Sequence, residues 1–359
     1  MTRPAPGFPR VAAYAANRGY GAPLLVGDVP NMDLITKLAR YPICTLNTSP
    51  WYSVLEPSRP AVPLLLRRAN PRICILGYQL LGWWYLGPDF TVAPWDKTFA
   101  GSWHTAIKET AGFDMKSGSG WFVRWDNPAT ESALTNLLCG AAASRLFNGL
   151  FFDYAWALNG VASAAMDRMI HAVRQAGGPG FLMLGNGPHA DTLNLDGELR
   201  EGYPDHLGND FSAIRTWRAV RPHRSLDWLQ SGTGFTSLDT PESQRAARFA
   251  LGTSCLFGTL CSIGPDRDLT VQPSYMGWWL PEYDGGGIGT GWLGEPRRPA
   301  KTHNGLLWDR DFCGGAVVVN AGSAEVTVGL VPGYRLIDGT AVGTVTVGAM
   351  DSVFLVRAS

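Results

Sequence analysis

Residues 149–156 read GLFFDYAW, an apolar run that meets an acidic residue, Asp153, and then continues with aromatic side chains. A short continuous apolar run bounded by turn-forming residues predicts a strand buried on both faces, as in a parallel sheet. A carboxyl group directly after such a run is costly in a core without partners, but it is natural at a strand end that faces a cleft. We therefore expect Asp153 at the end of a parallel strand.

Seven further apolar runs share this pattern, and helical stretches lie between many of them. The runs cover residues 11–16, 42–47, 72–79, 180–185, 197–203, 225–230 and 258–263. The helical stretches cover residues 59–69, 95–110, 129–147, 160–176, 210–220 and 241–257. Thr240 before Pro241 is typical of a helix start. Strands that alternate with helices eight times predict an α/β fold, a (β/α)8 TIM barrel.

The chain departs from this alternation in three places. Residues 120–127 predict an extra short strand inside the third connection, and the link between 185 and 197 is too short for a full helix. Residues 265–300 are a loop rich in glycine, proline and tryptophan, and short alternating runs separated by turns follow it. These runs predict a small antiparallel β domain. We predict a catalytic barrel over residues 1–300 and a C-terminal β-sandwich-like domain over residues 301–359.

The composition argues against several classes of protein. The 30 basic side chains balance the 30 acidic ones without a basic run, which disfavours nucleic-acid binding. No apolar stretch reaches the roughly 20 residues of a membrane span. The N-terminus lacks a signal-peptide pattern, so we expect a cytoplasmic protein by default, with a secreted or virion-associated location left open. The six cysteines show no CxxC spacing, and we expect them to be buried free thiols.

Acidic side chains near predicted strand ends are the candidates for catalysis, because barrel enzymes place their catalytic groups at the carboxyl ends of strands. Asp153 is the first candidate. Glu201 and Glu198 compete for the second place, and since side chains alternate along a strand, these two point to opposite sides. Glu201 lies nearer the strand end and is favoured. Asp126 and Asp227 are weaker alternatives, for which turn capping and ion pairing are the favoured explanations.

Two carboxyl groups that face one cleft are what glycosidic cleavage requires. One protonates the leaving oxygen, and the other attacks the anomeric carbon or activates water. Several of the 14 tryptophans fall in or beside predicted strand-end loops, where flat rings suit the apolar faces of sugars. The chain has no GxSxG elbow, no phosphate-binding GxxxxGK[ST] loop and no HExxH pair. The sequence therefore implies neither a metal nor an organic cofactor.

Several segments, in this order, resemble polygalactosaminidase-like glycoside hydrolase barrels. GLFFDYAW resembles their fourth-strand motif, FLMLGNG and LREGY their fifth- and sixth-strand segments, and WWLPEYDGGGIGTGWLGEP their loop after the eighth strand. DRDFCGGAVVVNAG resembles the first strands of their appended β domain. The resemblance implies that Asp153 is a nucleophile or base and that Glu201 is the proton donor. The chain departs from the family pattern at Asn148, where an aspartate is usual, and at the first acidic position of the WWLPEYD loop.

We therefore predict a glycoside hydrolase that cleaves an oligo- or polysaccharide, with Asp153 ionised and Glu201 protonated. The side chains expected to line its cleft are Tyr78, Asp126, Trp156, Asn186, Trp279 and Glu282. Asn186 would hydrogen-bond substrate hydroxyls or hold a carboxylate. The alternative is a non-catalytic carbohydrate-binding barrel, such as a surface or virion component. The expected partner is a carbohydrate in either case, with no nucleic acid or membrane involved, and the oligomeric state is left open.

Overall fold

The computed structural model of the chain divides into two compact units. The first comprises Met1–Arg3 and Tyr14–Leu199, and the second comprises Pro4–Ala13 and Arg200–Ser359. The residues that the structure describes are 7–14, 25–26, 29–47, 61–81, 83–84, 113–116, 120–153, 160–186, 193–203, 211–219, 226–232, 240–264 and 279–358. Each unit is described by itself below.

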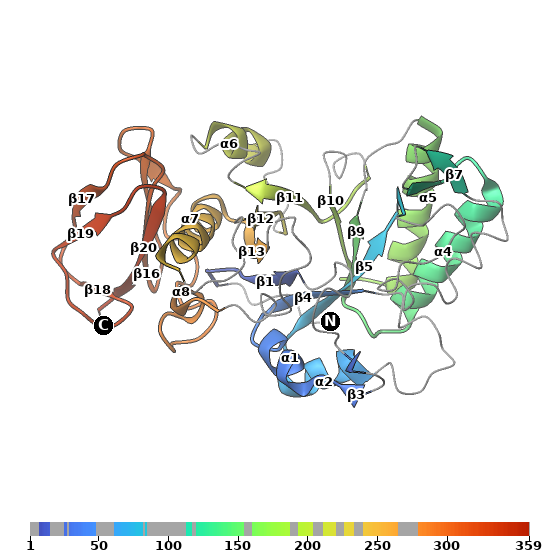
Figure 1. Cartoon of the computed structure of the whole chain (residues 1–359), viewed down its shortest axis with the longest axis horizontal. Helices are drawn as coiled ribbons and strands as arrows, with labels where there is room; N and C mark the ends of the chain where they lie inside the picture. Colours follow the sequence, from blue (N-terminus) through green and yellow to red (C-terminus); the bar gives the residue numbers. More distant parts are fainter. Residues whose placement is uncertain are drawn as a thin grey trace. The chain divides into compact units, whose positions relative to one another are not determined.

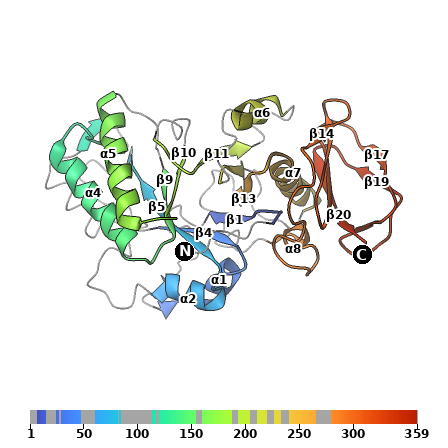
Figure 2. The same ribbon diagram turned by 180° about the vertical axis from the view of Figure 1, so that it is seen from behind.

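The first unit contains a run of parallel strands (Figure 1). Its strands are β4 (Ile43–Asn47), β5 (Cys74–Leu80), β9 (Gly149–Asp153) and β10 (Leu182–Asn186), which pair in this order. The start of β11 (Gly197–Tyr203) continues the pairing, with Asn186 opposite Leu199. Parallel neighbours need a crossover between them. The helices α2 (Ala61–Ala69), α4 (Pro128–Ala143) and α5 (Gly160–Gly177) supply crossovers, and both views show α4 beside α5 (Figures 1 and 2).

The extra strand predicted over residues 120–127 is present but shorter. It is β8 (Gly120–Val123), which pairs in antiparallel fashion with β6 (Trp83–Trp84) and β7 (Phe113–Lys116). The strand ends at Val123 because residues 124–127 turn into α4, with the Asn127 side chain accepting a hydrogen bond from the Ala129 amide at 2.9 Å. The prediction that this strand extends to residue 127 is therefore wrong.

A short helix between the first two barrel strands is absent from the sequence-based prediction. It is α1 (Met32–Leu38), which buries Leu34, Ile35 and Leu38. The Asn31 side chain caps it by accepting a hydrogen bond from the Leu34 amide at 3.2 Å. An asparagine before a helix is a recognised start signal, so the sequence contains a feature from which the start of this helix could be predicted. A two-stranded ribbon, β2 (Leu25–Val26) with β3 (Val29–Pro30), precedes it.

The second unit carries parallel strands of its own. They are β12 (Trp228–Gly232) and β13 (Leu260–Gly264), and a bridge joins Cys261 to Val11, just before β1 (Ala12–Tyr14). The helices α6 (Ser212–Ala219) and α7 (Pro241–Phe257) lie in this unit. Thr240 caps α7 as predicted, accepting a hydrogen bond from the Ser243 amide at 3.2 Å. Gly258 ends the helix at a positive φ of 75°, a conformation that glycine adopts without strain.

All eight predicted barrel strands occur. In the sheet they follow their order along the chain: β1, β4, β5, β9, β10, β11, β12 and β13. Parallel strands in sequential order, joined by helices, are the topology of the (β/α)8 barrel. This confirms the predicted fold class. The helix predicted over residues 95–110 lies outside the described residues, and the described part of the link after β10 (residues 193–196) contains no helix.

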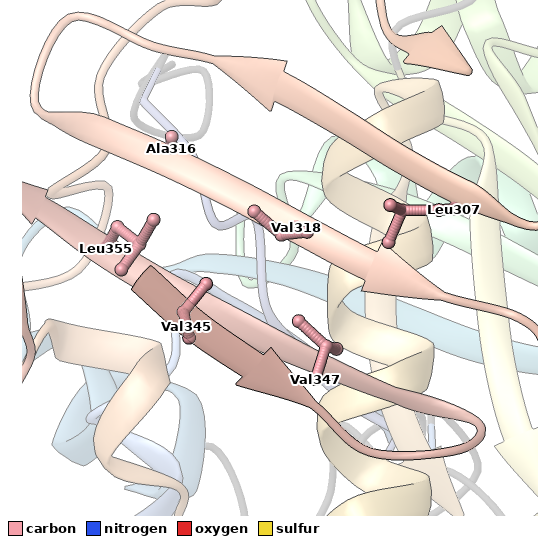
Figure 3. Packing of buried hydrophobic residues seen from close by; sticks show 6 residues of the cluster. All are labelled: Leu307, Ala316, Val318, Val345, Val347 and Leu355. Atoms are coloured by element: carbon pink, nitrogen blue, oxygen red, sulfur yellow. The ribbon is translucent and has the colours of Figure 1, made fainter. Parts of the chain in front are cut away.

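The C-terminal strands form the predicted antiparallel β domain. Five strands pair in the order β14 (Lys301–Thr302), β15 (Leu307–Asp311), β16 (Gly315–Asn320), β20 (Asp351–Arg357) and β18 (Tyr334–Leu336). A second sheet pairs β17 (Val326–Gly329) with β19 (Thr344–Val347). Alternate side chains of the two sheets point toward one another and form an apolar core (Figure 3). The six residues drawn are Leu307, Ala316, Val318, Val345, Val347 and Leu355.

Helix α7 packs against this domain as well as against β12 and β13. Gly252 allows the close approach, because a Cβ atom added there would overlap the side chains of Ser352 and Val319.

The domain boundary predicted near residue 300 stays a prediction.

The six cysteines are free thiols, as expected, but not all are buried. Cys313 is exposed, and Cys139 is partly so. Burial raises the pKa of Cys74 and Cys261 to about 12, so these thiols stay protonated.

Within the described ranges, no helix is both long and apolar enough to span a bilayer.

Candidate active site

Asp153 is the last residue of β9, a strand whose side chains are all buried. Leu150, Phe151 and Phe152 have no exposed surface, and Asp153 keeps 7% of its surface exposed. The strand therefore ends on a carboxyl group held in a largely apolar layer. An ionised carboxylate in such a place needs hydrogen-bond donors.

Tyr78 on β5 is one of these donors. Its hydroxyl donates a short hydrogen bond to Oδ2 of Asp153. The strands β5 and β9 are parallel neighbours, with Tyr78 opposite Phe151 and Leu80 opposite Asp153. Tyr78 is almost fully buried, with 4% of its surface exposed.

Asn186 on β10 is a second donor. Its side-chain Nδ2 donates to Oδ1 of Asp153 at 2.9 Å. The β9–β10 register pairs Phe152 with Gly185, which puts Asn186 next to the end of β9. Asn186 is the last residue of β10 and is half-buried. Three neighbouring strands of the first unit thus bring Tyr78, Asp153 and Asn186 together.

This arrangement determines what the carboxyl group can do. Each oxygen of Asp153 accepts a hydrogen bond, and hydrogen bonds to the charged form stabilise the carboxylate. A carboxylate of this kind suits a nucleophile or a base better than a proton donor. The sequence predicts Asn186 as a group that binds substrate hydroxyls or holds a carboxylate, whereas it predicts Tyr78 only as a side chain that lines the cleft.

The second predicted carboxylate, Glu201, belongs to β11 of the second unit, and its side chain lies outside the described residues. Glu198 on the same strand is fully buried. Asp227 is also fully buried and precedes β12, so it lies at the amino end of that strand. It forms an ion pair with Arg218, which in turn donates through Nε to the Phe257 carbonyl oxygen at 3.1 Å. This pairing links β12 to the C-terminus of α7, which agrees with the favoured ion-pair explanation.

Two further predicted cleft residues, Asp126 and Trp156, belong to the first unit. Asp126 is exposed in the turn before α4, where Arg124 approaches both its oxygens at 3.4 and 3.2 Å. The hydrogen bond from Arg124 lowers the pKa of the Asp126 carboxyl. Trp156 lies outside the described residues. Trp125, predicted to lie in or beside a loop, is buried and donates through Nε1 to the Leu81 carbonyl oxygen at 3.1 Å.

Trp279 and Glu282 belong to the second unit, at the short helix α8 (Pro281–Asp284). The Trp279 indole donates to Oδ2 of Asp284 at 3.1 Å and packs edge-on against Tyr283. Glu282 keeps 8% of its surface exposed, and its Oε1 lies 3.9 Å from Nε of Arg248. Burial raises the pKa of the Glu282 carboxyl. A role in substrate binding stays a prediction for both residues.

No group of three or more His, Cys, Asp or Glu side chains that could hold a metal ion occurs in the part of the chain that the structure describes.

Comparisons with known proteins relate the fold to a group of enzymes. In sequence, no protein-family model and no curated protein matches the chain. Many solved structures match its fold. The maltogenic α-amylase AmyB from Thermotoga neapolitana has a TM-score of 0.61 at 10% identity, covering 98% of this chain and 100% of that chain. In fold, the chain is similar to the α-amylases.

Two further structures support this similarity. The α-amylase from Geobacillus thermoleovorans, solved in complex with acarbose, has a TM-score of 0.54 at 12% identity and covers 91% of each chain. The type III pullulan hydrolase from Thermococcus kodakarensis has a TM-score of 0.55 at 16% identity, covering 91% of this chain and 70% of that chain. At these identities the likeness concerns the fold. The finer resemblance to polygalactosaminidase-like barrels stays a prediction.

Proposed function

We propose that the protein is a glycoside hydrolase that cleaves glycosidic bonds of an oligo- or polysaccharide. The observation that carries this proposal is Asp153, a buried carboxyl group at the end of a barrel strand whose two oxygens accept hydrogen bonds from Tyr78 and Asn186. In (β/α)8 enzymes the carboxyl ends of the strands form the active site. The similarity in fold to α-amylases and to a pullulan hydrolase agrees with this chemistry.

In the proposed reaction, Glu201 donates its proton to the glycosidic oxygen as the bond from that oxygen to the anomeric carbon breaks. Asp153 either adds to the anomeric carbon or takes a proton from the water that does. In the first case, water then releases the sugar from Asp153 and gives a proton back to Glu201. In the second case, a single step completes the hydrolysis. The other predicted cleft residues would bind the sugar, with tryptophans stacking on its apolar faces.

The experiment is a screen of polysaccharides for the release of reducing ends, followed by variants on a confirmed substrate. Asp153→Asn and Glu201→Gln should each lower turnover by about 10² to 10⁴-fold, the range typical of a lost acid or base. Asp33→Asn is a matched control, because Asp33 is exposed on α1 and forms a surface ion pair with nearby Lys37. The control should retain wild-type turnover. Near wild-type turnover of Asp153→Asn would contradict the proposal.

The same screen separates turnover from binding alone. A protein that is retained on an immobilised polysaccharide but releases no reducing ends would be a carbohydrate-binding barrel without catalysis. That outcome would replace the proposed function with the alternative.

A further inference from the structure

The side chains around Asp153 are arranged in two layers along the strands. Phe151 and Asp153 are two residues apart on β9, so they point to the same side of the sheet. Tyr78 is paired with Phe151 in the strand register, one layer below Asp153. Its ring stacks on the Phe151 ring at 5.9 Å between centroids, with 11° between the ring planes. The register alone would therefore pair Tyr78 with Phe151 rather than with the carboxyl group.

The length of the tyrosine side chain closes the gap between the layers. With the ring held against Phe151, the hydroxyl reaches Oδ2 of Asp153 in the layer above. Phe151 has no exposed surface and Tyr78 has very little, so the ring has little freedom to turn away. The stacked pair thus fixes the direction in which the hydroxyl donates.

Asn186 supplies a donor from the opposite side, through β10, to the other oxygen. A carboxylate that accepts hydrogen bonds through both oxygens has a fixed plane, and Tyr78 and Asn186 are both neutral groups. A phenol with its ordinary pKa near 10 remains protonated around neutral pH, and an amide does not titrate. Both can therefore donate over the whole pH range in which an enzyme of this kind would work.

We propose that Tyr78 is a positioning residue for Asp153: held by Phe151 and assisted by Asn186, it keeps the carboxylate ionised and correctly oriented. This inference rests on the proposed function for its catalytic meaning. It assigns Asp153 the role of nucleophile or base, and it leaves proton donation to another group. It also changes the predicted role of Tyr78 from contact with the sugar to contact with the carboxylate.

The test combines one measurement that does not need activity with one that does. The first follows the titration of Asp153 by NMR in protein labelled with ¹³C at the aspartate carboxyl carbons, with the Asp153 signal identified by its loss in Asp153→Asn. In Tyr78→Phe, which keeps the ring and removes the hydroxyl, the pKa of Asp153 should rise by about one unit or more.

The second measurement is the pH profile of kcat/KM on a confirmed substrate. In Tyr78→Phe the acidic limb should move to higher pH by the same amount as the NMR titration. The value at the optimum should fall by about tenfold or more, through kcat rather than KM.

A matched control comes from a second tyrosine–aspartate hydrogen bond. In the C-terminal domain the Tyr334 hydroxyl donates to Oδ1 of Asp311 at 2.9 Å. Tyr334→Phe should leave both the Asp153 titration and the acidic limb in place. Asn186→Ala removes the other donor and should raise the pKa of Asp153 in the same direction, which keeps the test decisive if Tyr78→Phe does not fold.

The outcomes separate this inference from the proposed function. An Asp153 titration that is unmoved in Tyr78→Phe and in Asn186→Ala would overturn the inference, whether or not the protein cleaves glycosides. A higher KM with an unmoved acidic limb would also overturn it and return Tyr78 to a role in sugar binding. A shifted titration in a protein that cleaves no glycoside would support the contact between Tyr78 and Asp153 while contradicting the proposed function.

Discussion

Asp153 and Glu282 are carboxyl groups buried to nearly the same extent, with 7% and 8% of their surface exposed, but their surroundings differ. Asp153 ends a barrel strand, and both its oxygens accept hydrogen bonds. Glu282 lies in a one-turn helix after the barrel strands. Its Oε1 is 3.9 Å from Arg248, while its Oε2 accepts no hydrogen bond from the residues that the structure describes.

The difference teaches that burial alone does not decide the charge of a buried acid, because hydrogen-bond donors to the carboxylate oppose desolvation. Desolvation disfavours the charged form of both groups. At Asp153 the two hydrogen bonds oppose this effect. At Glu282 desolvation is the largest influence and raises the pKa. The charge of Arg248 opposes this rise, but its hydrogen bonds go to both oxygens of Asp351, at 3.0 and 2.8 Å. Two equally buried acids therefore differ in the hydrogen bonds that their charged forms receive.

The largest effect is expected from Glu201→Gln on a natural glycoside. If Asp153 is the ionised partner, a different carboxyl group must supply the proton, and its loss should lower turnover by about 10² to 10⁴-fold. An activated aryl glycoside, whose leaving group needs no proton, should lose far less. Kinetics on the two substrates measure the difference. Equal losses would show that Glu201 is not the acid, and Glu198 would then be the next candidate.

A smaller effect, on stability, is expected from Arg248→Met. The change leaves Asp351 and Glu282 close together without their cation. Removing one member of a fully buried ion pair costs about 3–5 kcal/mol, and since these side chains keep some exposure we expect about 2 kcal/mol in the free energy of unfolding. Denaturant titration measures it. Arg168→Met is the matched control, because Arg168 forms a similar bidentate ion pair with Glu131 on the surface.

The control variant should lose no more than about 1 kcal/mol, the usual value of an exposed ion pair. Equal losses in Arg248→Met and Arg168→Met would mean that the cluster of Arg248, Asp351 and Glu282 stabilises the fold no more than an exposed ion pair does. The surroundings of Glu282 would then not serve as a contrast to those of Asp153.

The smallest effect is expected from Glu282→Gln, and it depends on pH. Because the pKa of Glu282 is raised in the folded protein, folding is favoured while the group is protonated, and this stability is lost as pH rises through the raised value. The glutamine variant cannot ionise. It should match the wild type at about pH 4 and exceed it by about 1 kcal/mol at about pH 8.

Thermal unfolding at the two pH values measures this difference. Glu325→Gln, at an exposed position of the C-terminal domain, is the control and should show no such dependence. A glutamine variant at position 282 that is less stable than the wild type at the higher pH would show that the carboxylate is ionised and favourable there.

The sequence predicted the barrel well because its strands are buried on both faces and therefore appear as continuous apolar runs. All eight runs correspond to strands, with boundaries displaced by a few residues. The helix α1 was missed because it is only two turns long, although Asn31 marked its start. The end of β8 was placed too far along because Trp125 extends the apolar pattern, whereas the chain has already turned toward α4.

The candidate site was predicted in part. Asp153 could be singled out because an acid follows an apolar run, and Asn186 because a polar residue directly follows the next run. The contact between Tyr78 and Asp153 could not be derived, since it depends on the register of β5 against β9 and on a ring stacked one layer below. Likewise, nothing in the sequence WWLPEYD shows that Arg248 and Asp351, far away along the chain, approach Glu282.

The central claim is that Asp153 is the ionised catalytic carboxylate, and chemical rescue of Asp153→Ala tests it most directly. The variant is assayed on an activated aryl glycoside with increasing azide, and with chloride at the same ionic strength as control. We expect turnover lowered by about 10² to 10⁴-fold, then restored in proportion to azide as the anion takes the place of the carboxylate and a glycosyl azide accumulates. Wild-type turnover without azide, or a loss that azide does not restore, would contradict the claim.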